Sequence, residues 1–217
     1  MNLDLDVVDH LLCSTRSVRK RLDFSRPIEP ELIERCIEIA IQSPTGSNMQ
    51  GWAFVVVTDD AKKKAIAEYY RKGFELYAQM PRPERDAEDL REKQQGRVVD
   101  SAMYLAEHME KAPAFLIPCI EGRVENQPQF AQASVYGSVL PAAWSFMLAA
   151  RARGLGSAWT TIHLMFEKEC GEILGIPADW TQTALLPIAW FTGEDFKPAK
   201  RIPARELTYW DSWGTTR

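Results

Sequence analysis

The chain has 217 residues, of which 46% are hydrophobic and 26% charged, and its formal net charge is -4. This composition is typical of a globular protein, and the length predicts one domain, residues 1–217, with a sizeable core. The acidic balance argues against nucleic acid as a partner, because domains that bind nucleic acid usually carry a basic excess.

The first half of the chain predicts three helices and one strand. Apolar residues recur at helical spacing over residues 5–14, 30–43 and 60–78, and Pro30 is well placed to open the second helix. Residues 52–58, WAFVVVT, form a nearly continuous β-branched and aromatic run. We therefore expect a strand that is buried on both faces.

The second half of the chain predicts three further helices and two strands. The helices cover residues 98–109, 130–153 and 166–174, and the strands cover residues 114–120 and 184–191. Pro118 places the first strand at an edge or an irregular position, because proline lacks the N–H needed for the ladder. The longest helix is apolar on nearly all sides, which predicts a place in a core or a subunit interface.

Residues 80–96 differ in character from the rest of the chain. They contain Pro81 and Pro83 and then the charged run ERDAEDLREKQQ. One interpretation is a solvated connection that includes a helix. The other is a variable, mobile lid over a cleft, because long connections are often functional.

The cysteines and the N-terminus bear on the cell compartment. The four cysteines are scattered without a CxxC pair, which predicts buried, reduced thiols rather than a zinc site: Cys13, Cys36, Cys119 and Cys170. The N-terminus is acidic and lacks the apolar core of a signal peptide, and we expect no apolar run long enough to span a bilayer. The expectation is a cytoplasmic protein without membrane contact.

Two basic clusters lie far apart in the sequence, at residues 16–21 and 197–201. An anion between them would relieve the repulsion of like charges. The forked donors of Arg16, Arg19 and Arg201, with the hydroxyl of Ser17, suit the several acceptor oxygens of a phosphate monoester. These residues predict a phosphate site.

A polar turn lies between the two clusters, immediately before the strand at residues 52–58. It contains Thr45, Ser47, Asn48 and Gln50. Amide side chains both donate and accept hydrogen bonds, which suits the alternating groups along the edge of an isoalloxazine ring. We therefore interpret the basic clusters and this turn as one FMN site.

Four segments together resemble the FMN-dependent nitroreductase family in the family's own order. They are Arg16-Ser17-Val18-Arg19, residues 40–54, residues 154–161, and residues 186–190 followed by Lys200-Arg201. Two positions depart from the family pattern. Thr15 replaces the first Arg of the phosphate signature, which puts the strength of phosphate binding in question, and Gly51 replaces the proline before Trp52.

The resemblance implies an α+β fold with a central, mostly antiparallel sheet flanked by helices. It also implies an intertwined homodimer with FMN at the interface, the turn at residues 44–52 coming from the partner. NADH or NADPH would reduce the flavin, and a nitroaromatic, quinone or similar small acceptor would then take up the hydride from flavin N5 in a ping-pong cycle. Thr160 and Thr161 resemble residues that approach the ring. No catalytic side chain is predicted, and His163 is expected to be structural.

Two alternatives remain open. The segment at Thr160-Thr161 resembles the deiodinase-like branch of reductive dehalogenases, although the lid residues of that branch cannot be placed between residues 70 and 100. The other alternative is a flavin-binding module without reductase turnover. Relatives also include an enzyme that fragments its own reduced flavin with oxygen.

Overall fold

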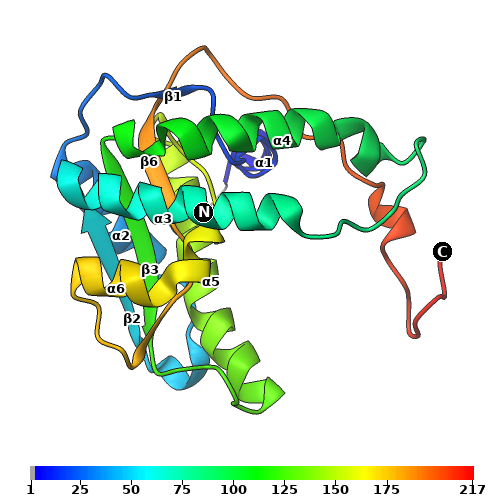
Figure 1. The fold of residues 1–217 in the computed structure, drawn as a ribbon. Helices are drawn as coiled ribbons and strands as arrows, with labels where there is room; N and C mark the ends of the chain where they lie inside the picture. Colours follow the sequence, from blue (N-terminus) through cyan, green and yellow to red (C-terminus); the bar gives the residue numbers. More distant parts are fainter. Residues whose placement is uncertain (1–2) are drawn as a thin grey trace.

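The computed structural model describes residues 3–217, which form a sheet covered by helices (Figure 1). The helices are α1 (Leu5–Ser14), α2 (Pro30–Ala40), α3 (Asp60–Gln79), α4 (Leu90–His108), α5 (Gln129–Arg151) and α6 (Glu167–Leu174). The strands are β1 (Leu22–Asp23), β2 (Trp52–Val57), β3 (Ala114–Glu121), β4 (Leu155–Ser157), β5 (Trp180–Gln182) and β6 (Leu186–Phe191). Among the short 3-10 turns, η1 (Gly46–Asn48) precedes β2 and η3 (Ile162–Phe166) precedes α6.

The sheet is antiparallel in every pairing of the described strands, which confirms the predicted α+β class. Its order is β1-β6-β3-β2, with β4 also paired to β6 and β5 to β3. The prediction that residues 52–58 are buried on both faces is wrong. β2 is an edge strand, and its residue Val56 is 39% exposed.

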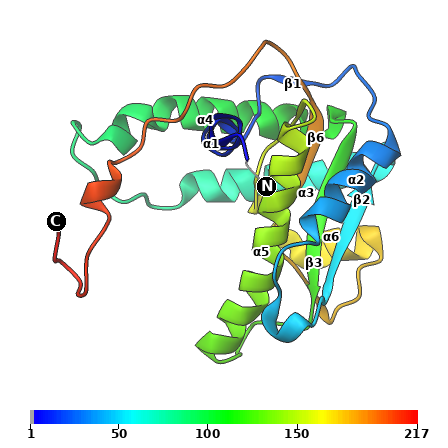
Figure 2. The same cartoon turned by 180° about the vertical axis from the view of Figure 1, so that it is seen from behind.

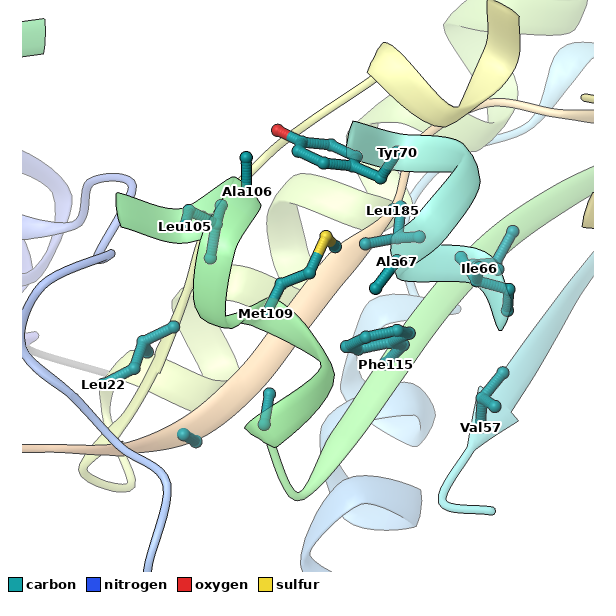
Figure 3. Packing of buried hydrophobic residues seen from close by; sticks show 14 of the residues in the cluster. Leu22, Val57, Ile66, Ala67, Tyr70, Leu105, Ala106, Met109, Phe115 and Leu185 are labelled. Atoms are coloured by element: carbon teal, nitrogen blue, oxygen red, sulfur yellow. The ribbon is translucent and has the colours of Figure 1, made fainter. Parts of the chain in front are cut away.

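Two helical layers cover the two faces of the sheet. Successive residues of β3 alternate between them: Leu116 packs in the cluster with α2 and α5, whereas Phe115 and Ile117 pack in the cluster with α3 and α4. Figure 3 shows Phe115 among the side chains of the second cluster, and Figure 2 shows α2 and α5 on the opposite face. Each fully buried large side chain contributes about 1.5–3 kcal/mol to folding.

Pro118 lies in the centre of the sheet, at an irregular position. β3 pairs with β6 through Ala114–Leu116 and with β5 through Cys119–Glu121, so Pro118 falls where one neighbour gives way to the other. Thr183 donates both its backbone N–H, at 3.0 Å, and its hydroxyl, at 2.9 Å, to the Pro118 carbonyl. These bonds satisfy the Pro118 carbonyl at the point where the neighbouring strand changes, and the expectation of an irregular position holds.

Two expectations about burial need correction. α5 is long and apolar enough to cross a bilayer, with a mean hydropathy of 1.3 over its best window. It nevertheless packs on the sheet through Phe146, Met147 and Ala150, which marks a core helix. Cys36, Cys119 and Cys170 are buried as expected, but Cys13 is exposed on α1.

Candidate functional site

The two basic clusters of the sequence meet at one pocket of about 560 Å³. One wall comes from the segment between α1 and β1, a second from the segment after β6, and a third from α4. The lining residues carry no carboxylate and seven cationic side chains: Arg16, Arg19, Lys20, Arg21, Arg97, Lys197 and Lys200. In this acidic chain, the pocket is therefore a concentrated site of positive charge.

The segment at residues 16–19 is held in place by the strand β4 and the loop that follows it. The Val18 N–H donates to the Ser157 carbonyl at 2.8 Å, and the Trp159 N–H donates to the Ser17 hydroxyl oxygen at 3.2 Å. A Cβ atom at Gly156 would lie 3.1 Å from Val18, so this close approach favours glycine. Because Ser17 accepts from the backbone, its own hydroxyl proton remains available to a ligand.

The three arginines predicted to bind phosphate differ in burial and in their hydrogen-bond partners. Arg19 is partly buried, and its burial lowers the pKa of the guanidinium; its Nη1 donates a long bond of 3.4 Å to the hydroxyl of Ser101. Arg16 donates from Nη1 to the Lys197 carbonyl at 3.3 Å. Arg201 is exposed and does not line the pocket, whereas its neighbour Lys200 does.

The polar turn lies far from this pocket within one chain. Figures 1 and 2 both show the turn before β2 beside the N-terminal end of α5, at the end of the molecule opposite α4 and β1. Ser47, Asn48 and Gln50 all have positive φ, at 51°, 54° and 50°. Three side-chain-bearing residues in this region within four positions indicate backbone strain of the kind found at functional sites.

Local contacts hold the turn in this conformation. The Gly46 N–H donates to the Ser138 hydroxyl oxygen at 3.0 Å, and the Gln50 N–H donates to the Thr45 hydroxyl oxygen at 3.3 Å. The amide of Gln50 donates to the Asn48 Oδ1 at 3.2 Å. The side chains of Asn48 and Gln50 are exposed, so both amides can reach a ligand or a second chain.

The threonine pair follows directly from the segment that holds residues 16–19. Thr160 is buried, pairs through its backbone with Leu185, and donates its hydroxyl to the Tyr70 phenol oxygen at 2.9 Å. Thr161 is exposed. The structure therefore brings Arg16, Ser17, Arg19 and this pair to one side of the molecule.

His163 has a structural environment. Its ring is fully buried, and neither ring nitrogen has a hydrogen-bond partner among residues 3–217. Burial lowers its pKa to about 3. The imidazole is thus neutral at ordinary pH, and it has no hydrogen-bonded group among residues 3–217 to which it could pass a proton.

A second polar cluster was not predicted from the sequence. Arg123, after β3, donates to both carboxylate oxygens of Glu167, at 2.8 and 2.9 Å, and to the Trp180 carbonyl at 2.7 Å. It also pairs with Glu125. The sequence gives no signal for this cluster, because Glu167 and Trp180 are 44 and 57 residues away from Arg123. The cluster joins the end of β3 to α6 and β5.

Comparisons with known proteins agree with this fold. A sequence model of the nitroreductase family matches residues 13–190. The 5,6-dimethylbenzimidazole synthase of Rhodospirillum rubrum is 29% identical over 95% of this chain and 90% of that protein. A putative NADH dehydrogenase/NAD(P)H nitroreductase of Archaeoglobus fulgidus is 25% identical over 77% of this chain and 75% of its own length.

Solved structures show the same architecture. Iodotyrosine deiodinase bound to FMN and 3-iodo-L-tyrosine has a TM-score of 0.69 at 18% identity, covering 94% of this chain and 99% of that one. An FMN and NADPH-dependent nitroreductase from sphigopyxis sp. strain HMH has a TM-score of 0.68 at 23% identity, with the same coverage. Since the family match spans most of the length and the sheet and helices follow the same arrangement, this chain belongs to the nitroreductase family.

Proposed function

We propose that this chain is an FMN-dependent oxidoreductase, folded as a single domain, that uses NADH or NADPH to reduce nitroaromatic, quinone or similar acceptors. The observation that carries the proposal is the cationic pocket where residues 16–19 meet residues 197–200. When bound, FMN supplies ping-pong hydride transfer through its N5. The chain's own residues bind and orient it.

The pocket fits a phosphate monoester in charge and in donor chemistry. Arg16 and Arg19 offer forked donors, Ser17 offers a neutral one, and no carboxylate lines the pocket to compete with an anion. The bonds from Val18 and Trp159 fix this segment beside Thr160 and Thr161. A phosphate held here would place the rest of the cofactor within reach of the threonine pair.

A homodimer would complete the site. The turn with Thr45, Ser47, Asn48 and Gln50 lies at the end of the molecule opposite α4, which forms a wall of the pocket (Figure 1), so in this proposal it would serve the cofactor of a partner rather than its own. The chain also exposes apolar side chains on α1 and at the start of α5, where Phe130 is 77% exposed. Burial of these surfaces between two copies would be favourable and would let the turn of one protomer reach its partner's pocket.

A second candidate comes from the Rhodospirillum rubrum relative, which is named as a 5,6-dimethylbenzimidazole synthase and matches nearly the whole chain. In that case the flavin would be consumed rather than recycled. The candidates differ in whether FMN survives a cycle of reduction and re-oxidation in air.

The deciding experiment is an anaerobic absorbance spectrum of the purified protein before and after NADPH, and then NADH. We expect an oxidised flavin spectrum that bleaches with one or both donors and returns in full when an acceptor is added. Bound FMN that neither donor bleaches would favour a flavin-binding module. Loss of FMN in air with formation of dimethylbenzimidazole would favour the synthase, and a protein that takes up no FMN would overturn the whole site.

A further inference from the structure

Helix α4 supplies a wall of the cationic pocket that the sequence motifs do not contain. Gln94, Arg97, Val98 and Ser101 line it, at spacings of three, four and seven residues. These spacings place them on one face of the helix. One face of the first half of α4 therefore lies beside residues 16–21 and lines the same pocket.

Arg97 is the exceptional cation on this helix. The other two basic residues in the first half of α4 have carboxylate partners, since Arg91 pairs with Asp89 and Lys93 pairs with Glu88. Arg97 lines the pocket and has no hydrogen bond or ion pair with any residue among 3–217. Its guanidinium thus remains available to an anion.

The pocket has more positive charge than its internal contacts use. Lys20 pairs with Asp100 at 2.5 Å, and Arg21 donates to the carbonyls of Thr192 and Asp195 at 2.5 and 2.8 Å. Arg16, Arg19, Arg97, Lys197 and Lys200 form no ion pair with a carboxylate among residues 3–217. Like charges gathered in one pocket repel each other, and the attraction of each cation to an anion at their centre would offset that repulsion.

The first half of α4 is attached to the body mainly at this pocket. Every side chain from Leu90 to Asp100 is exposed or half-buried, and the fully buried residues of the helix begin at Leu105. Lys20–Asp100 and the long Arg19–Ser101 bond are the polar contacts between this half and residues 16–21. Few buried contacts make such a segment easy to open locally.

We propose that Arg97 binds the flavin phosphate together with Arg16, Ser17 and Arg19, and that loading of FMN thereby fixes the first half of α4 over the pocket. The inference rests on the proposed function, since it needs FMN as the ligand. It adds a third element to the phosphate site. It also links cofactor binding to the segment at residues 80–96, because residues 90–96 form the first turns of this helix.

The first test measures FMN affinity of apo-protein by equilibrium dialysis, without any turnover. Arg97→Ala should weaken binding by roughly tenfold, as expected for the loss of one charge-assisted contact. Arg97→Lys should recover part of the loss, because it keeps the charge without the fork. The matched control is Arg91→Ala, on the same helix but outside the pocket, which should bind FMN like the unaltered protein.

The second test measures amide hydrogen exchange across α4 with and without FMN. In the unaltered protein we expect residues 90–101 to exchange more slowly when FMN is added, with little change in α2. This protection should be reduced in Arg97→Ala at FMN concentrations that saturate both proteins. Equal FMN affinity and equal protection in the two proteins would overturn the inference while leaving the proposed function intact, whereas absence of FMN binding by the unaltered protein would overturn both.

Discussion

The hydroxyl of Thr160, in the loop after β4, donates a hydrogen bond of 2.9 Å to the phenol oxygen of Tyr70 on α3. Both residues are buried. Burial raises the pKa of Tyr70, while the Thr160 bond and the nearby charge of Arg19 oppose that rise. The pair ties the cationic pocket and the candidate flavin-facing loop to the hydrophobic core, where Figure 3 shows Tyr70 above Ala67 and Phe115.

Replacement of Tyr70 by Phe should lower the free energy of unfolding by about 0.5–1.5 kcal/mol, because the Thr160 hydroxyl loses its acceptor in a buried place. Urea unfolding followed by circular dichroism measures the change. Tyr77→Phe is the matched control, since Tyr77 lies on the same helix and is 54% exposed. Equal losses in the two variants would show that the Thr160 bond contributes nothing to stability.

Replacement of Arg19 by Ala should weaken FMN binding by about 1.5–3 kcal/mol, or roughly ten- to hundredfold, because a partly desolvated phosphate would lose a charged donor. Equilibrium dialysis of apo-protein against FMN gives the dissociation constant. Arg35→Ala serves as the control, since Arg35 pairs with Glu38 on α2 and is remote from the pocket. Full FMN retention by the Arg19 variant would refute the assignment of residues 16–19 to phosphate binding.

The sequence was most informative where a long element carries a regular pattern. Apolar residues at helical spacing located α2 and α3, and the β-branched and aromatic runs located β2, β3 and β6. The pattern of residues did not locate β4 or β5, because each has three residues, too few to show any periodicity. Burial of β2 was misjudged because an apolar run does not reveal whether a strand has one neighbour or two.

The candidate site was predictable only in part, for a related reason. The local motifs at residues 16–19 and 45–50 could be recognised, because their residue types occur together in the sequence. The α4 wall with Arg97 and the Arg123–Glu167 cluster could not, since each depends on residues brought together by folding from distant positions. The charged composition of residues 80–96 fitted a solvated connection as well as a lid over a cleft, so it did not point to this wall of the pocket.

His163 should make stability depend on pH. Its pKa in the folded state is about 3, below the ordinary value of 6.5, so the unfolded chain takes up the proton first as pH falls. The stabilisation is thus fully present above about pH 6.5 and is lost progressively toward pH 3. Between pH 7 and pH 5, the unaltered protein should lose roughly 2 kcal/mol more than His163→Leu, which cannot take up that proton.

Urea unfolding at pH 7, 6 and 5 measures this difference. The carboxylates titrate in both proteins, so their contributions cancel when the two slopes are compared. Parallel slopes would mean that His163 is protonated as easily in the folded protein as in the unfolded chain.

Gly73 and Gly96 should respond in opposite ways to replacement by alanine. A Cβ at Gly73 on α3 would lie 2.9 Å from the Ile162 carbonyl oxygen, whereas a Cβ at Gly96 on α4 would meet nothing within 4 Å. Gly73→Ala should therefore destabilise the protein by about 1–3 kcal/mol through overpacking. Gly96→Ala should stabilise it by up to about 1 kcal/mol, because alanine favours a helix.

Thermal unfolding of both variants tests the packing between α3 and η3. Gly73 contacts the residue that directly follows the threonine pair, so a shift there would also move Thr161. Unchanged stability of Gly73→Ala would indicate that η3 moves away from α3 without cost.

Asn48→Gly should separate the backbone role of the polar turn from its role in binding. Asn48 has a φ of 54°, which glycine adopts without strain, so stability should change by no more than about 1 kcal/mol. The amide that we expect to contact the flavin ring is removed, and FMN affinity should fall several-fold. The matched control is Asn126→Gly, since Asn126 is also exposed and has a φ of 67° in a different loop. If both variants bind FMN equally well, Asn48 serves the conformation of the turn alone, and the ring edge must be held by other residues.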